Sequence, residues 1–259
     1  MRKLENKVII VTGAFSGIGK EITKLFISHG ATVIGTGRNK VNAIKLQKEI
    51  KLKYGKDNDD SLFMYHLGDI TKNETVKSVV DLTLDKYKKI DIIVNNAGMI
   101  DRFNTAHNMT DELWEYILKL NLTAPMKLTR EVLPYMIKQK YGIIINIGSL
   151  GSVCGARGGV GYVSTKHGLL GLTKNTAQAY GKDGIRSNLI APSFSLTGIL
   201  EPHKEIKIRG FKMVLRGIKA GFRLIRKKDI ARLALFLAND ESKIINGQYI
   251  VIDDGWSAY

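Results

Sequence analysis

Short apolar runs alternate with longer stretches of helical period along almost the whole chain. The runs are continuously apolar, as in residues 8–11 and 142–147, and such runs are typical of strands buried on both faces. Strands that alternate with helices are joined by right-handed crossovers, so the pattern predicts a mostly parallel sheet. We therefore predict a three-layer, doubly wound α/β fold with seven strands. The predicted strands are residues 8–11, 32–36, 62–67, 90–94, 142–147, 185–190 and 248–252, and the predicted helices are about 16–28, 44–50, 74–87, 110–137, 161–180 and 229–238.

The chain has 259 residues, enough for one large domain or two small ones. No internal repeat, low-complexity tract or linker divides it, so we predict a single domain over residues 1–259. Its composition, 44% hydrophobic and 25% charged, excludes a disordered, collagen-like or coiled-coil chain. The apolar run after the charged N-terminus has four residues, whereas a secretory leader needs about 7–15, so we expect a soluble, cytoplasmic protein.

Charge and cysteine content limit the partners. Lys and Arg outnumber Asp and Glu by 40 to 24, a net charge of +16, with an isoelectric point of about 9.8. Such a charge favours nucleic acid, a phosphorylated or carrier-bound substrate, or a membrane surface; the alternative is a lysine-rich surface that faces solvent. The single cysteine, Cys154, excludes an internal disulfide, and the five histidines show no ligand spacing, so we predict no metal.

Three glycines follow the first predicted strand and open the first helix. Gly13, Gly17 and Gly19 let the backbone turn tightly and approach a ligand without Cβ atoms in the way. The helix that follows directs free N–H groups and a positive dipole end at the same place, which suits a pyrophosphate. Between the first strand and first helix of an α/β chain, this triplet indicates a phosphate-binding loop; the alternative is a tight turn without a ligand.

Two further positions suggest acid–base chemistry. Tyr162 is the one tyrosine of ten with a lysine, Lys166, four residues on, and such residues share a helix face. A free phenol has a pKa of about 10, and a neighbouring ammonium favours the phenolate. Ser149 follows the fifth strand, where its hydroxyl can bind a substrate oxygen in the crevice at the strand ends. The alternatives are a half-buried tyrosine beside a solvated lysine, and a serine that caps a turn.

With Asn95-Asn96-Ala97-Gly98 after the fourth strand, these motifs resemble those of the classical short-chain dehydrogenase/reductase family. They fall in the family's order on the expected elements, and the resemblance covers residues 8–256. It implies a Rossmann fold, a nicotinamide cofactor and a homotetramer. The implied activity is that of an NAD(P)-dependent oxidoreductase that interconverts a carbonyl group and a secondary alcohol by hydride transfer.

The resemblance also implies roles for the site residues. Tyr162 exchanges a proton with the substrate oxygen, which Ser149 polarises. Lys166 lowers the pKa of Tyr162 and holds the nicotinamide ribose, and Asn121 holds a helix distortion and completes a proton relay. The implied cofactor-binding residues are Gly13, Ser16, Gly17, Ile18, Gly19, Arg38, Asp69, Ile70, Asn95, Ala97, Gly98, Tyr162, Lys166, Pro192 and Thr197.

The end of the second strand bears on the choice of nicotinamide. An NAD-specific site usually has an acidic residue there, whereas this chain has Gly37 followed by Arg38. An arginine can pair with the 2′-phosphate of NADP, although serine, at Ser16, stands where some NADP-preferring members have a basic residue. We favour NADP(H), with NAD(H) as the alternative; otherwise Arg38 is a surface residue that opens the next helix.

Residues 203–228 contain ten basic residues and one acidic residue, which is +9 of the net charge. The family has its substrate lid at about 195–228, so we predict a lid helix there, and Ser193 stands just before it where the family usually has glycine. Apolar residues recur at helical spacing in this segment and form one predicted stripe: Phe211, Leu215, Ile218, Phe222 and Ile225. Basic residues form a second stripe beside it, which would face solvent, an anionic substrate such as an acyl thioester, or a membrane surface.

The basic lid favours a reductase of 3-oxoacyl thioesters. The alternatives are a sugar or polyol dehydrogenase of the glucose 1-dehydrogenase type and a regulator that senses the NADP(H) pool without turnover. The complete catalytic set argues against the regulator. A nucleic-acid binder would need base-stacking aromatic residues on its basic face, and we expect the lid aromatics to be buried, so we predict no nucleic-acid partner.

Overall fold

The computed structural model describes residues 2–54, 62–194, 207–218 and 224–258. The seven strands in this part of the chain form one sheet, in which all neighbouring strands are parallel, in the order β3-β2-β1-β4-β5-β6-β7. This confirms the predicted seven-stranded α/β fold. The strands are β1 (Val8–Thr12), β2 (Thr32–Gly37), β3 (Phe63–Leu67), β4 (Ile92–Asn95), β5 (Gly142–Ile147), β6 (Ile185–Pro192) and β7 (Tyr249–Ile252).

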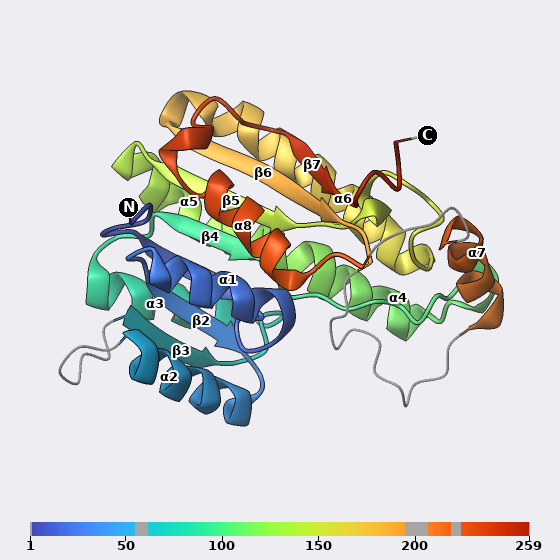
Figure 1. The fold of residues 1–259 in the computed structure, drawn as a ribbon, viewed down its shortest axis with the longest axis horizontal. Coiled ribbons are helices and arrows are strands. Elements are labelled where there is room, and N and C mark those ends of the chain that lie inside the picture. Colours follow the sequence, from blue (N-terminus) through green and yellow to red (C-terminus); the bar gives the residue numbers. More distant parts are fainter. Residues whose placement is uncertain (1, 55–61, 195–206, 219–223, 259) are drawn as a thin grey trace.

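Helices cover both faces of the sheet (Figure 1). In β1, Ile9 and Val11 pack into one helix layer and Val8 and Ile10 into the other, which explains why the strand is apolar at every position. None of the helices in the described ranges is long and apolar enough to cross a membrane. The first layer contains α1 (Gly17–Ser28), α2 (Lys40–Tyr54) and α8 (Lys227–Leu237), and the second contains α3 (Asn73–Tyr87), α5 (Ala124–Gln139) and α6 (Val160–Tyr180).

The stretch 110–137, predicted as one long helical segment, is divided into three parts. α4 (Asp111–Leu118) is followed by a π-helical turn (Lys119–Thr123), and α5 begins at Ala124. A π turn inserts one extra residue into the helix and re-aims the side chains on either side of it. Most other helix and strand boundaries lie within two residues of the predicted ones.

The helix α7 (Ile208–Ile218) lies beyond the sheet, on the side toward which the strand arrows point (Figure 1). Its Phe211 ring is centred 5.4 Å from that of Phe103, and Val214 is 2% exposed. Leu215, predicted on the buried stripe, is 37% exposed, so that part of the prediction is wrong. The inward face of the helix instead contains Gly210, where an added Cβ atom would collide with the Phe103 carbonyl, and Val214 one turn later. Phe222, on the same predicted stripe, lies outside the described residues.

A chain of buried polar side chains joins the sheet to α6. The Asn95 amide donates to Asn146 Oδ1 at 2.8 Å, and Asn146 Nδ2 donates to Thr173 Oγ1 at 2.8 Å. Thr173 in turn donates to the Leu169 carbonyl at 2.7 Å. These three polar side chains are at most 3% exposed, so each depends on the others for its hydrogen bonds. The chain fixes α6 relative to the carboxyl ends of β4 and β5.

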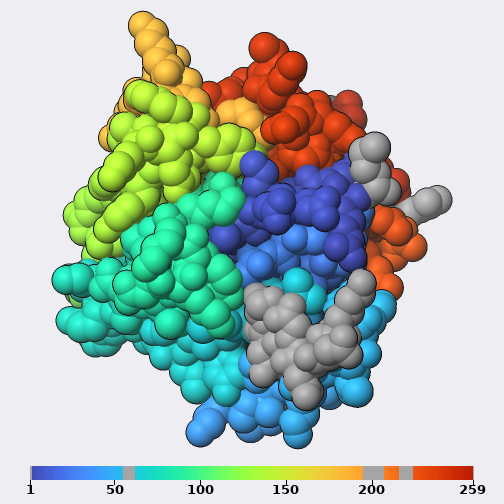
Figure 2. All heavy atoms as spheres, turned by 90° about the vertical axis from the view of Figure 1, so that its left-hand side faces the viewer, coloured from blue at the N-terminus to red at the C-terminus, as the bar shows by residue number. Residues whose placement is uncertain are grey.

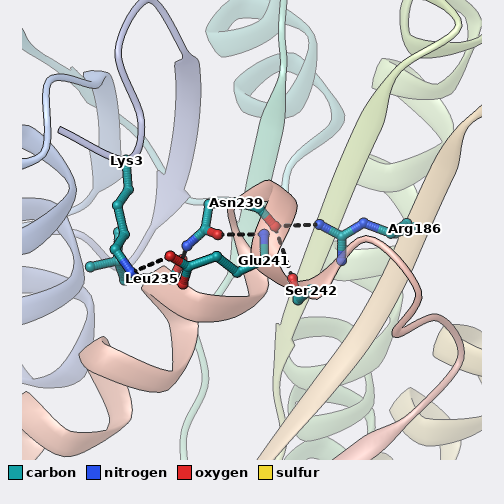
Figure 3. Close-up of polar contacts among 6 residues, drawn as sticks. All are labelled: Lys3, Arg186, Leu235, Asn239, Glu241 and Ser242. Carbon is teal, nitrogen blue, oxygen red and sulfur yellow. Dashed lines mark hydrogen bonds and ion pairs between the residues drawn. The ribbon is translucent and has the colours of Figure 1, made fainter. Parts of the chain in front are cut away.

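On the opposite side of the molecule, the N-terminal segment contacts the segment that follows α8. Lys3 pairs with Glu241 at 2.7 Å, and Arg186 of β6 donates to the Asn239 carbonyl (Figure 3) and to the carbonyl of Leu237, the last residue of α8. These contacts supply partners to carbonyl groups that the end of the helix leaves unpaired. Figure 2, which faces this side, shows the blue N-terminal residues beside red atoms of the last part of the sequence.

We predict that Asn146→Ala lowers the free energy of unfolding by about 3 kcal/mol, because it removes two buried hydrogen bonds and leaves the Asn95 amide only the longer contact of 3.5 Å with Thr129 Oγ1. Urea unfolding followed by circular dichroism measures this loss. The matched control is Asn175→Ala, an exposed position on α6, which should change stability little. A loss below about 1 kcal/mol at Asn146 would show that the buried chain is dispensable.

Candidate active site

Parallel strands all end at one edge of a sheet, and the loops that follow them meet there. In Figure 1 the arrowheads mark this edge on the side of α7. The glycine turn after β1, Ser149 after β5 and the start of α6 all lie at this edge. The fold thus brings together motifs that are more than a hundred residues apart in the sequence.

The glycine turn is closed by Asn96, which belongs to the Asn-Asn-Ala-Gly motif but is not among the predicted cofactor-binding residues. Its Nδ2 donates to the carbonyls of Thr12 and Gly13 at 2.9 and 3.2 Å, and its backbone N–H donates to Thr12 Oγ1 at 3.0 Å. A Cβ atom at Gly19 would come 2.5 Å from Asn96 Nδ2 and collide with the Gly13 carbonyl. Gly13 and Gly17 have φ values of 64° and 56°, in the left-handed region that favours glycine. The backbone therefore requires glycine here.

The amino end of α1 fits a pyrophosphate. Ser16 occupies the N-cap position without a side-chain cap, and the first turn contains no acidic residue. Among the hydrogen bonds of the described residues, none uses the N–H groups of Gly17, Ile18 or Gly19. Free N–H groups at a positive helix end are what a phosphate needs.

Two residues predicted to bind a cofactor have structural partners. The Asn95 side chain points into the sheet toward Asn146, so only its backbone remains for a ligand. Asp69 accepts a hydrogen bond from the Thr71 N–H at 3.0 Å, so its carboxylate has a structural role in the turn after β3. Burial alone would raise the pKa of Asp69, but the Thr71 hydrogen bonds and the Arg38 and Lys72 cations hold it below its ordinary value. Ile70, beside Asp69, is 7% exposed and packs with the second helix layer.

Arg38 is exposed at the end of β2, directly after Gly37. Its Nη1 donates to the Tyr116 hydroxyl of α4 at 3.2 Å, across the edge where the strands end. No ion pair of Arg38 occurs among the described residues, so the guanidinium keeps most of its donors for an anion.

Asn121 lies within the π turn and is 1% exposed. Its Oδ1 accepts from the Met99 N–H at 3.0 Å, and its Nδ2 donates to the Met99 carbonyl at 2.8 Å. The same nitrogen lies 3.3 Å from Thr165 Oγ1, one residue from Lys166. The predicted helix distortion therefore exists, and Asn121 ties it to the loop after β4. Gly98 of that loop is so close that an added Cβ atom would lie 3.1 Å from Asn121 Oδ1 and 3.8 Å from Lys166 Nζ.

Ser149, Tyr162 and Lys166 lie together. The Ser149 hydroxyl accepts from the Gly151 N–H at 3.0 Å, and a Cβ atom added at Gly151 would lie 3.5 Å from Ser149 Oγ and 3.3 Å from Tyr162 Cε1, so both side chains flank the same glycine. The Lys166 ammonium is 5.6 Å from the centre of the Tyr162 ring and donates to the Ile147 carbonyl at 2.8 Å. Lys166 is 5% exposed, whereas Tyr162 keeps part of its surface in solvent. This arrangement can hold a substrate oxygen between two hydroxyl groups.

Burial opposes ionisation of both groups. It raises the pKa of the Tyr162 phenol, against the hydrogen bond from Ser149, and the negative charge of Asp101 adds to the rise. Burial also lowers the pKa of Lys166 to about 8. The shift of Tyr162 comes from burial, Ser149 and Asp101, and the lowering of its pKa by Lys166 stays a prediction.

Pro192 ends β6, and the Ser193 N–H donates to the Ile252 carbonyl at 3.0 Å. Ser193 is not among the residues with positive φ, so its backbone does not need the glycine that the family usually has there. The Ser193 hydroxyl is buried and has no hydrogen-bond partner within the described chain, which leaves it for a bound group. Thr197, also predicted to bind the cofactor, lies outside the described residues.

Comparisons with known proteins agree with this geometry. The sequence model described as short chain dehydrogenase matches residues 7–207. The chain is 38% identical to 3-oxoacyl-[acyl-carrier-protein] reductase of Thermotoga maritima, covering 98% of both chains. It is 35% identical to 3beta-hydroxysteroid dehydrogenase 2 of Eggerthella lenta, covering 99% of this chain and 96% of that protein. The crystal structure of levodione reductase superposes with a TM-score of 0.87 at 25% identity, covering 99% of this chain and 100% of that one.

The lowered pKa of Lys166 predicts a pH dependence of stability. Below pH 8 the Lys166 ammonium is charged in both the folded and the unfolded state, and its burial as a charged group destabilises the folded state. Above pH 10.5 the amine is neutral in both states. Between these values the unfolded state binds more protons, so the free energy of unfolding should rise with pH by about 3 kcal/mol relative to Lys166→Met. Urea unfolding between pH 7.5 and 10 measures most of this rise.

The matched control is Lys174→Met, an exposed lysine two turns along α6, whose stability should follow the wild type at each pH. Parallel curves for the wild type and Lys166→Met would mean that burial of Lys166 does not perturb its ionisation.

Proposed function

The chain belongs to the short-chain dehydrogenase family and is an oxidoreductase, and from this premise we propose that it interconverts a carbonyl group and a secondary alcohol with NADP(H). The observation that carries the proposal is that Ser149 and Tyr162 flank the same glycine, Gly151, with the buried Lys166 ammonium 5.6 Å from the Tyr162 ring centre. Hydride transfer is the chemistry that a bound nicotinamide supplies. The protein supplies orientation and the proton.

Tyr162 is the proposed general acid and base. Its hydroxyl gives a proton to the carbonyl oxygen in reduction and takes it from the alcohol in oxidation. Ser149 donates a hydrogen bond to the same oxygen and stabilises the negative charge that it gains. Because the phenol has a raised pKa in the protein alone, we expect Tyr162 to hold its proton at neutral pH, which suits the reductive direction.

Lys166 and Asn121 support this step. The Lys166 ammonium, charged below pH 8, is proposed to hold the ribose hydroxyls of the cofactor and to favour the phenolate once the cofactor is bound. Asn121 holds the π turn against the Met99 backbone through two hydrogen bonds. Its proposed role is to complete a proton relay beside Lys166. The free N–H groups of Gly17, Ile18 and Gly19 are proposed to hold the pyrophosphate.

NADP(H) is favoured over NAD(H) because of the charge at the end of β2. Gly37 stands where an NAD-specific site usually has an acidic residue, so no carboxylate at that position repels a 2′-phosphate. The exposed guanidinium of Arg38 can pair with this phosphate. Asp69 lies close enough to Arg38 for its carboxylate to compete for the guanidinium. We expect a homotetramer, as in the family.

We propose a 3-oxoacyl thioester as the substrate, because basic residues such as Arg209 and Lys212 are exposed on α7. The similarity to a 3-oxoacyl-[acyl-carrier-protein] reductase supports this class. A cyclic secondary alcohol is the second candidate, supported by the relative named 3beta-hydroxysteroid dehydrogenase 2 and by the apolar contact of Phe103 with Phe211.

The test is oxidation of NADPH and of NADH by the purified protein with an acetoacetyl thioester, followed at the nicotinamide absorbance. Turnover with NADPH supports the thioester reductase. Turnover only in the oxidative direction, with a 3β-hydroxysteroid or a sugar, replaces the thioester by that class. No hydride transfer with any of them contradicts the proposal.

We predict that Tyr162→Phe lowers kcat by about 10²–10⁴-fold and leaves cofactor affinity nearly unchanged, because it removes only the proton that moves. Stopped-flow turnover and cofactor titration measure the two effects. Tyr180→Phe, at the other end of α6, is the control and should retain full activity. Near-normal turnover of Tyr162→Phe would refute the acid–base assignment.

We predict that Arg38→Ala raises the KM for NADPH by roughly 10–100-fold, the loss expected for a hydrogen bond to a charged phosphate, and leaves the KM for NADH unchanged. Steady-state kinetics with both cofactors measure the difference. Arg130→Ala, exposed on α5, is the matched loss of charge and should change neither value. An unchanged KM for NADPH in Arg38→Ala would remove the argument for NADP(H).

A further inference from the structure

Asp101, in the loop between β4 and α4, is a carboxylate with no solvent exposure. None of the ion pairs within the described ranges includes it. A buried carboxylate without a countercharge is costly unless backbone donors surround it. The residues that supply those donors therefore indicate why the carboxylate is there.

The donors come from the start of α6. Asp101 Oδ1 accepts from the Gly159 N–H at 3.1 Å, and Oδ2 accepts from the Tyr162 N–H at 3.0 Å. The N-cap of this helix is Gly159, which has no side chain to cap it. A carboxylate 58 residues away in sequence performs the capping and also meets the positive end of the helix.

The glycines before α6 make this approach possible. A Cβ atom at Gly159 would collide with the Asp101 carboxylate, and one at Gly158 would lie 2.5 Å from the Tyr162 ring. The Val160 N–H donates to the Asn104 carbonyl at 2.8 Å, which adds a second attachment. The loop thus accepts hydrogen bonds from the backbone N–H groups of Gly159, Val160 and Tyr162 at the helix start.

The loop itself is held in an uncommon conformation. Arg102 and Phe103 follow Asp101 with φ values of 56° and 61°, in the left-handed region that non-glycine residues rarely adopt. Such conformations persist where the surrounding structure holds them, and they cluster at functional sites. Here the surrounding contacts are the helix start on one side and Phe211 of α7 on the other.

We propose that Asp101 is a positioning residue for the reaction: its carboxylate fixes the first turn of α6 and thereby the Tyr162 hydroxyl against Ser149. This inference rests on the proposed function, in which Tyr162 moves the proton. Asp101 would not touch the substrate, and its effect would reach the reaction through the backbone of Tyr162 and through its charge.

The charge has a separate effect that distinguishes this role from a structural one. Three groups among the described residues face the Tyr162 phenol: Ser149 lowers its pKa, Asp101 raises it, and Lys166 lies 5.6 Å from the ring centre. Removal of the Asp101 charge should therefore lower the pKa of Tyr162. In alcohol oxidation, which needs the phenolate, the rise of kcat with pH should then begin at lower pH.

The test compares Asp101→Asn with Asp91→Asn, a buried carboxylate before β4 that also accepts a backbone N–H, that of Val8 at 2.8 Å. We expect Asp101→Asn to lower kcat roughly tenfold or more, as misplacement of a catalytic group does, and to move the pH profile to lower pH. Asp91→Asn should keep the wild-type profile. An Asp101→Asn profile and kcat like those of Asp91→Asn would overturn the proposal.

Asp101→Glu keeps the charge but is one methylene longer, so it should lower kcat with an unshifted profile. If Asp101→Asn does not fold, a wild-type kcat in Asp101→Glu overturns the proposal and a lowered one supports it. Hydrogen exchange of the amides of residues 159–162 gives a readout without turnover, and these amides should lose protection in Asp101→Asn but not in Asp91→Asn. If the wild type transfers no hydride, the proposed function fails, while this exchange still tests whether Asp101 fixes the helix start.

Discussion

Burial of a parallel sheet on both faces is the constraint on which the rest of this structure depends. Because helices cover both faces, each strand must be apolar throughout, and the polar chemistry is confined to the loops at the strand ends. Parallel strands direct one set of those loops to a single edge. The few polar side chains inside, from Asn95 through Asn146 to Thr173, join the sheet to the helix that carries Tyr162 and Lys166. The core thus sets the position of the site.

The loop after β4 connects the parts of the site. It closes the glycine turn, holds the π turn, caps α6 and packs against α7, although the sequence analysis selected it only for its Asn-Asn-Ala-Gly segment. A different residue of the loop makes each of these four contacts. In the first three, a side chain pairs with a backbone group, so one partner of each hydrogen bond is held by the main chain. The residues in that order are Asn96, Met99, Asp101 and Phe103.

The electrostatics of the site follow from burial. The phenol of Tyr162 and the ammonium of Lys166 both shift toward their neutral forms, because the protein alone offers them little of the hydration that ions need. The amino end of α1 and the exposed Arg38 favour negative charge. A cofactor with negatively charged phosphates would therefore meet positive groups at those phosphates, and Tyr162 with the buried Lys166 at the other end of the site.

The sequence by itself determined the strands, the glycine turn and the spacing of Tyr162 and Lys166. These features depend on residues close together in the chain, because the periods of a strand and of a helix decide which side chains share a face. Periodicity alone did not predict the break in the stretch 110–137; the family resemblance implied a distortion at Asn121, and the structure shows the hydrogen bonds with Met99, 22 residues away, that tie it to the loop after β4. The inward face of α7 likewise depends on the approach of Gly210 to Phe103, and the role of Asp101 on a helix start 58 residues away. Only the tertiary structure decided these features, because a buried polar group bonds with whichever partner the packing places beside it. That partner can be distant in sequence, so local patterns do not predict it.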